Sequence, residues 1–221
     1  MRAVYYETHG DAEVLQIGEL NKPACGDEQV LVEVAAAGVN PIDRRLRAGE
    51  LQEYIQRTFP VTPGFDLSGR IVEVGDAVTG WQVGDEIMGL AFTWSIQHGT
   101  YAEFAPVDAG AIAPKPVNAS FEQAAGIPLV SLTAWQSLLE FGQLGPGKTV
   151  LIQAGAGGVG SVAIPMAKYL GATVYTTASA ANTDYVLSLG ADVVIDYQKD
   201  SYERAILEAE PDGVDMVLEA L

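Results

Sequence analysis

The feature that most constrains the fold of this chain is a run of glycines, Gly155-x-Gly157-x-x-Gly160, between an apolar strand and a helix. Hydrophobic patterns predict the strand over 148–153 and the helix over 158–170. In this setting the first glycine allows a tight turn, the second lets a pyrophosphate approach the backbone, and the third lets helix and strand pack closely. The N–H groups of the first helical turn then face an anion. The loop therefore predicts a dinucleotide site in an α/β unit.

The residues around the next strand bear on which dinucleotide binds. The loop lacks the Gly-Lys-Ser/Thr ending of a nucleotide-hydrolysing P-loop, so a dinucleotide is the better ligand. In NAD sites an acidic residue about twenty residues after the glycines accepts a hydrogen bond from the ribose 2′-hydroxyl. Here residues 176–183 contain no carboxylate, and the first one is Asp184. Hydroxyl and amide groups suit a 2′-phosphate, so Ser179 and Asn182 favour NADPH over NADH. The same residue types also suit a helix N-cap.

The chain changes character near residue 121. Short strands between glycine and proline turns are predicted at 30–36, 69–74, 85–90 and 101–106. Ser120 and Gln123 then resemble a capping box that opens a helical stretch, which Pro128 interrupts. After the glycine loop, helices at 183–189 and 201–208 alternate with strands at 173–177, 192–196 and 214–218. This alternation predicts a parallel sheet with helices on both faces. We therefore expect an all-β barrel domain over 1–121 and an α/β domain over 122–221.

Composition narrows the range of partners. The 221 residues carry 29 acidic and 12 basic side chains, a formal net charge of −17. Such a surface repels nucleic acid and anionic lipid, so we expect neither as a partner. Residues 121–170, which hold the glycine loop, are neutral overall. The single Cys25 cannot form an internal disulfide, and the sequence shows no signal core and no apolar run long enough to span a membrane. These features predict a cytoplasmic protein.

Five further motifs occur in order along the chain. They are Gly38-Val39-Asn40-Pro41-x-Asp43-x-x-x-Arg47-x-Gly49, Pro63-Gly64-Phe65-Asp66-x-x-Gly69, Gly84-Asp85-Glu86-x-Met88-Gly89, Gly99-Thr100-Tyr101-Ala102-Glu103-Phe104 and Leu132-Thr133-Ala134-Trp135. Together with the glycine loop, this ordered set resembles the zinc-independent quinone oxidoreductases of the medium-chain dehydrogenase/reductase superfamily. The resemblance implies a GroES-like β-barrel catalytic domain followed by a Rossmann domain with a doubly wound parallel sheet.

The resemblance also implies where the cofactor lies. Asn40 and the two residues after it would line the nicotinamide from the barrel side, with Thr133 on the Rossmann side. The glycine loop would follow the pyrophosphate, and Tyr197 would contact the adenine. Taken with the 2′-phosphate argument, the expected cofactor-binding residues are Pro41, Ile42, Thr133, Gly155, Gly157, Gly158, Val159, Gly160, Ser179, Asn182 and Tyr197. Arg45 stands where the family often has an aromatic residue or a lysine, which leaves the substrate open.

The resemblance bears on zinc as well. Zinc alcohol dehydrogenases, which are similar to this chain, have a cysteine where it has Asn40 and a histidine where it has Phe65. They also have a four-cysteine lobe that Cys25 alone cannot build. A catalytic zinc needs three protein ligands, and His9 and His98 lie at opposite ends of the barrel sequence. We therefore expect no metal site.

A chain without zinc ligands has no Lewis acid for an alcohol oxygen, so its substrate must already be activated. A quinone or another α,β-unsaturated carbonyl compound fits, because hydride from NADPH puts negative charge on a conjugated oxygen that a hydrogen bond can stabilise. Asn40 and Arg45 are the expected donors, and Asp43 either orients its neighbours or forms a structural turn. The alternative is an NADPH-binding protein without turnover, of crystallin-like or redox-sensing type.

The length of the chain sets a last expectation. A doubly wound sheet of about six strands needs further βα units after the strand at 214–218. We expect the chain to be C-terminally truncated, to hold only the first half of its Rossmann domain and to expose an apolar sheet edge at its last strand, with impaired activity. The family commonly dimerises through the far edge of this sheet. A homodimer is therefore expected for the full-length form.

Overall fold

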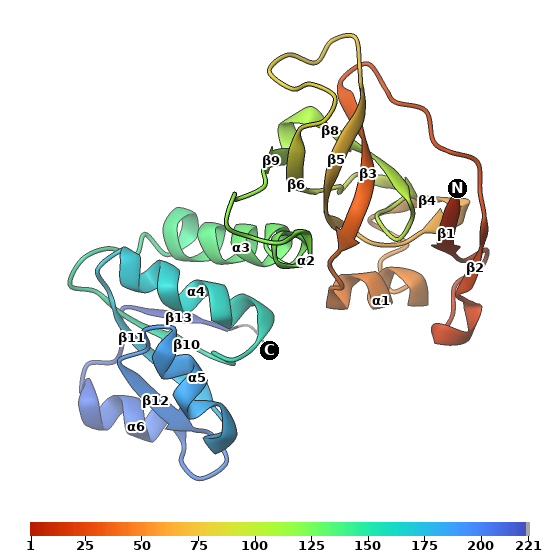
Figure 1. Ribbon diagram of the computed structural model, residues 1–221. Helices are drawn as coiled ribbons and strands as arrows, with labels where there is room; N and C mark the ends of the chain where they lie inside the picture. The colour runs from red at the N-terminus through yellow and green to blue at the C-terminus, as the bar shows by residue number, and fades with distance from the viewer. Residues whose placement is uncertain (220–221) are drawn as a thin grey trace. The chain divides into compact units, whose positions relative to one another are not determined.

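The computed structural model describes residues 1–219, which belong to two compact units (Figure 1). The first unit runs from Met1 to Leu129, and the second begins at Val130. The boundary expected near residue 121 falls inside the first unit, because α2 (Phe121–Ala125) packs on β3, β5 and β6 of that unit. The capping box predicted for this helix is confirmed: Ser120 Oγ accepts from the N–H of Gln123, and Gln123 Oε1 accepts from the N–H of Ser120.

The first unit is built around a five-stranded antiparallel sheet with the order β8-β3-β5-β6-β9. Its strands are β3 (Gln29–Ala37), β5 (Asp66–Val74), β6 (Glu86–Leu90), β8 (Phe104–Asp108) and β9 (Ile112–Pro114). Alternate side chains along β3 and β5, such as Val30, Val32 and Ile71, are fully buried in one apolar cluster. The four strands predicted in this unit are confirmed as β3, β5, β6 and β8, with ends that differ by a few residues.

Smaller elements complete this unit. They are β1 (Arg2–Tyr5) paired antiparallel with β2 (Gln16–Glu19), β4 (Gln56–Thr62) paired parallel with β7 (Ser95–His98), α1 (Pro41–Ala48), and the short 3-10 turns η1 (Ala12–Val14) and η2 (Ala109–Ala111). A second apolar cluster packs beneath α1 and includes Tyr6, Leu46 and Phe65. This cluster places the buried start of α1 close to the start of β5.

The second unit is a four-stranded parallel sheet with the order β12-β11-β10-β13. Its strands are β10 (Thr149–Ile152), β11 (Thr173–Ala178), β12 (Val193–Asp196) and β13 (Met216–Leu218). Its helical segments are most of α3 (Pro128–Trp135), the π-helical η3 (Gln136–Phe141), α4 (Gly158–Tyr169), η4 (Ala180–Asn182), α5 (Thr183–Ser188) and α6 (Tyr202–Ala209). The predicted alternation of strands and helices is confirmed.

Helices cover both faces of this sheet, as Figure 1 shows for α4 and α5 on one side and α6 on the other. Successive residues of β10 point to opposite faces, so Val150 and Ile152 join the core under α4 while Leu151 joins the cluster under α6 with Ile206. Within the described chain β13 forms one edge of the sheet, where Leu218 is buried and Val217 is exposed. None of the helices in residues 1–219 combines the length and apolar character needed to cross a membrane.

Candidate cofactor site

The glycine loop follows β10 and leads into α4. Its first and third glycines are required by packing, because a Cβ on Gly155 would overlap Thr176 Oγ1 and a Cβ on Gly160 would overlap the carbonyl oxygen of Ala154. The loop is also tied to β11: Thr177 Oγ1 accepts from the N–H of Ala154 at 3.0 Å, and the Thr177 carbonyl accepts from the N–H of Gly155 at 3.0 Å. The loop is therefore held in one conformation by its neighbours.

The middle glycine is different. A Cβ on Gly157 would meet only Ala154, with its carbonyl oxygen at 3.1 Å and its Cβ at 3.9 Å. Gly157 also has extended backbone angles, φ −78° and ψ 175°, which any residue can adopt. Backbone strain therefore does not explain a glycine at this position, and a Cβ would need only a small shift of the Ala154 carbonyl. The open side of Gly157 faces a pocket, so the missing side chain leaves room for a ligand.

The helix that follows presents positive charge to the same place. Gly157 is the N-cap of α4, and the first turn holds Gly158, Val159 and Gly160 without an acidic side chain. The N–H groups of a first helical turn have no partner within the helix, and the helix dipole adds to their attraction for an anion. This combination suits a phosphate.

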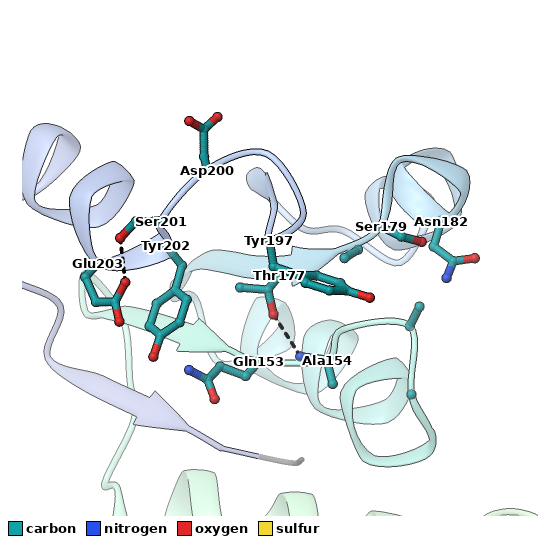
Figure 2. Close-up of a pocket in the computed structure, with 13 residues that line it drawn as sticks. Gln153, Ala154, Thr177, Ser179, Asn182, Tyr197, Asp200, Ser201, Tyr202 and Glu203 are labelled. Atoms are coloured by element: carbon teal, nitrogen blue, oxygen red, sulfur yellow. Dashed lines mark hydrogen bonds between the residues drawn. The ribbon is translucent and has the colours of Figure 1, made fainter.

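A pocket of about 670 Å³ lies at the carboxyl ends of β10, β11 and β12 (Figure 2). Gly157 lines it, together with Gln153 at the end of β10 and Tyr202 at the start of α6. Gln153 is buried, and within the described chain its Oε1 atom has no hydrogen-bond partner. A buried polar atom without a partner is costly unless a ligand or water satisfies it. The pocket thus carries an unmet hydrogen-bonding site as well as free space.

The two ends of the pocket differ in chemistry, as Figure 2 shows. One end holds Ser179 and Asn182, and the other holds Ser201 and Glu203, whose carboxylate accepts from Ser201 Oγ at 2.6 Å. Ser179 and Asn182 occupy the N-cap positions of η4 and α5, yet neither side chain makes a capping hydrogen bond. Their hydroxyl and amide groups are therefore not committed to capping. Tyr197 lines the same pocket with its ring more than half exposed.

Buried polar groups form a second cluster, in the first unit. Asn40 is the N-cap of α1, and its backbone N–H donates to Asp43 Oδ2 at 2.8 Å. The Tyr101 hydroxyl donates to the same oxygen at 2.8 Å. The Asn40 side chain donates through Nδ2 to Asp66 Oδ2 at 2.9 Å. Burial raises the pKa values of Asp43 and Asp66, against the opposing effect of these hydrogen bonds.

The predicted site residues therefore fall into separate groups. The pocket in the second unit brings together Gly157, Ser179, Asn182 and Tyr197. In the first unit Asn40 and Asp43 are in contact, whereas the guanidinium of Arg45 pairs with Glu50 (Nε to Oε2, 3.1 Å) and is half exposed. The remaining predicted residues are not among those that line the pocket. They are Pro41 and Ile42 in the first turn of α1, Thr133 in α3, Gly155 in the loop, and Gly158, Val159 and Gly160 at the start of α4.

The structure adds residues that the sequence analysis did not single out, chiefly Gln153 and Asp66. Gln153 ends an otherwise apolar strand directly before the loop, a signal that could have been read from the sequence. The partnership of Asp66 with Asn40 joins residues from distant segments. In residues 1–219 no three His, Cys, Asp or Glu side chains lie close enough together to hold a metal ion. The expectation of no metal stays a prediction.

Comparisons with known proteins give the family. Residues 26–117 match the alcohol dehydrogenase GroES-like domain, and residues 158–221 match the family described as zinc-binding dehydrogenase. The Arabidopsis thaliana protein named NADPH-dependent alkenal/one oxidoreductase, chloroplastic, is 38% identical over all of this chain and 57% of its own length. The chain spans 57% to 61% of the length of three of the curated relatives that it matches.

Solved structures agree with these matches. The quinone oxidoreductase from Coxiella burnetii is 36% identical, with a TM-score of 0.83 over 93% of this chain and 65% of that one. The Escherichia coli quinone oxidoreductase, complexed with NADPH, is 29% identical, with a TM-score of 0.82 over 96% of this chain and 63% of that one. The two units thus have the GroES-like and Rossmann-like folds that the motifs predicted. A structure titled NAD-dependent alcohol dehydrogenase is 33% identical, with a TM-score of 0.89 over 98% of this chain and 70% of that one. This chain belongs to the medium-chain dehydrogenase/reductase superfamily, in which it is similar to quinone oxidoreductases.

Proposed function

We propose that this protein transfers a hydride from NADPH to a quinone or another α,β-unsaturated carbonyl compound. The observation that carries the proposal is the pocket beside Gly157, where a glycine without a side chain leaves a helix N-terminus open to an anionic ligand. The names of the relatives supply the reaction class, since they are an alkenal/one oxidoreductase and quinone oxidoreductases, one of them bound to NADPH.

The pocket residues fit a phosphorylated dinucleotide. The N–H groups of Gly158 and Val159 would hold the pyrophosphate, and Tyr197 would face the adenine. Ser179 and Asn182 would donate hydrogen bonds to the 2′-phosphate of NADPH. A carboxylate at this end of the pocket would instead favour the 2′-hydroxyl of NADH, and neither residue is acidic. When bound, NADPH supplies the hydride.

The substrate side of the proposal rests on the cluster around Asn40. Its amide would donate a hydrogen bond to the oxygen that gains charge as a conjugated carbonyl is reduced. Arg45 is engaged by Glu50, so we assign the donor role to Asn40 and leave proton delivery to solvent. We propose that no zinc takes part: the Asn40 amide donates to Asp66, and Phe65 is buried in an apolar cluster, so neither offers a metal ligand.

The direct test is turnover. The chain is mixed with NADPH and a panel of quinones, alkenals and enones while the loss of reduced nicotinamide is followed, and NADPH binding is measured separately by calorimetry. We expect turnover with NADPH in preference to NADH, unchanged after dialysis against a chelator. Tight binding of NADPH without turnover on any acceptor would contradict hydride transfer and support the alternative, a cofactor-binding protein without catalysis.

A further inference from the structure

Asp66 is an ionisable residue buried at the start of β5, with 1% of its surface exposed. Its two carboxylate oxygens have different partners. Oδ2 accepts from Asn40 Nδ2 at 2.9 Å, and Oδ1 accepts from the backbone N–H of Leu129, the second residue of α3, at 2.9 Å. The backbone N–H of Leu129 therefore fixes one oxygen of the carboxylate, and the other oxygen fixes the side chain of Asn40.

The backbone of Asn40 is fixed independently of its side chain. Its N–H donates to Asp43 Oδ2, and its carbonyl accepts from the N–H of Asp43 at 3.0 Å. Asp43 is in turn held by the Tyr101 hydroxyl. The Asn40 side chain also faces the backbone N–H of Asp43 in a capping box, which places its oxygen on the helix side. The contact on the other side of the amide then decides whether the nitrogen stays in place there.

The contact with Asp66 keeps the nitrogen there. An ionised carboxylate can only accept hydrogen bonds, so it pairs with the amide nitrogen of Asn40 and repels the amide oxygen. A flipped amide would also leave a buried acceptor on Asp66 without a donor. One N–H of Asn40 is thus committed to Asp66, and the other N–H and Oδ1 keep fixed directions.

We infer that Asp66 is a positioning residue for Asn40, whose amide it holds in the one orientation that serves the substrate's carbonyl oxygen. The consequence for catalysis rests on the proposed function, whereas the orientation itself does not. Asp66→Asn keeps the size of the side chain and replaces the acceptor that faces Asn40 with a group that can donate or accept. Because the N–H of Leu129 needs an acceptor, the new oxygen stays on Leu129 and the new amide nitrogen faces Asn40, which favours a flipped Asn40 amide.

The matched control is Ser68→Ala. Ser68 lies on the same strand and is fully buried, and its hydroxyl donates to the Phe121 carbonyl at 2.5 Å without contacting Asn40. Each substitution changes one hydrogen bond made by a buried side chain of β5. Only Asp66→Asn should lower kcat, by at least about tenfold, because misplaced catalytic groups cost rates of this order. We expect NADPH affinity to stay within about twofold of wild type in both variants.

A second readout needs no turnover. NMR of ¹⁵N-labelled wild-type protein should show one proton of the Asn40 side-chain amide protected from exchange with water. Asp66→Asn should abolish this protection, and Ser68→Ala should preserve it. If Asp66→Asn does not fold, the wild-type spectrum decides: two freely exchanging Asn40 protons would overturn the inference.

A double substitution completes the design. If Asp66 acts through Asn40, adding Asp66→Asn to Asn40→Ala should cause no further loss of kcat. A further tenfold loss would overturn the inference, as would a loss in Ser68→Ala equal to that in Asp66→Asn. Absence of wild-type turnover would count against the proposed function alone, since the protection measurement still tests the orientation.

Discussion

Replacing Gly157 with valine separates ligand binding from folding in the glycine loop. The backbone at Gly157 is extended, with φ −78° and ψ 175°, an ordinary conformation for a β-branched residue. A Cβ there meets only Ala154, and the Cγ atoms would extend into the pocket. We therefore expect the free energy of unfolding to fall by about 1 kcal/mol. The close contact with Ala154 and the loss of a favoured N-cap glycine cost stability, and the lower chain entropy of valine in the unfolded state offsets part of this cost.

The expected effect on NADPH is much larger. The added methyl groups would stand where a pyrophosphate approaches the N–H groups of the first turn of α4. A hydrogen bond to a charged group is worth about 1.5–3 kcal/mol, so losing two costs about 3–6 kcal/mol. Each 1.4 kcal/mol is about a tenfold change, so the Kd for NADPH should rise by at least about a hundredfold.

Calorimetric titration gives the Kd, and thermal unfolding gives the stability. The matched control is Gly155→Ala, whose Cβ would overlap Thr176 Oγ1 in the packed interior. Overpacking of this kind costs about 1–3 kcal/mol, so Gly155→Ala should lower Tm more than Gly157→Val does. A folded Gly157→Val protein with wild-type affinity for NADPH would refute the assignment of the phosphate site.

Three further predictions follow from the pocket and the buried acids. Ser179→Asp should shift preference from NADPH towards NADH, because a carboxylate repels the 2′-phosphate and accepts from a 2′-hydroxyl; equal losses for both cofactors would count against this role. Tyr197→Ala should weaken NADPH and NADH alike, by about 1–3 kcal/mol if the ring stacks on adenine, and calorimetry showing no loss would exclude the contact. Burial raises the pKa of Asp43 above 3.8, so the unfolded chain releases this proton first and stability falls as pH rises through that window. Urea unfolding measures the free energy of unfolding of wild type and of Asp43→Asn as pH rises from 3.8 to the raised pKa. The value for wild type should fall relative to that for Asp43→Asn, and a relative rise would contradict a raised pKa for Asp43.

The second unit could be predicted from the sequence because its signals are local. Strand β10 is a short run rich in apolar residues, β11 is rich in β-branched residues that favour strands, and the glycine loop marks the start of α4. In the first unit α1 was not predicted, because Asn40-Pro41 is typical of a turn. Strand β4 was not predicted either, since Pro60 in its interior argues against a strand.

The site was predictable only in part, for the same reason. Gly157 belongs to the glycine motif and Ser179 directly follows the next strand, so both can be identified from the sequence. The contact of Asn40 with Asp66 joins residues 26 positions apart, which no local pattern encodes. The pairing of Arg45 with Glu50 is local, and it depends on α1 ending at Gly49, a helix that the sequence analysis did not predict. The cytoplasmic location, the homodimer, and the absence of nucleic-acid and membrane partners stay predictions; the Arabidopsis relative is named as chloroplastic.

The measurement that tests the central claim most directly is the fate of a labelled hydride. An enone is incubated with the chain and NADPH carrying deuterium at the transferred position of the nicotinamide, and the product is examined by NMR. The account predicts one deuterium on the β-carbon of the reduced product and a solvent-derived hydrogen on the α-carbon. A reduced product without deuterium, or no reduced product from a chain that binds NADPH, would contradict it.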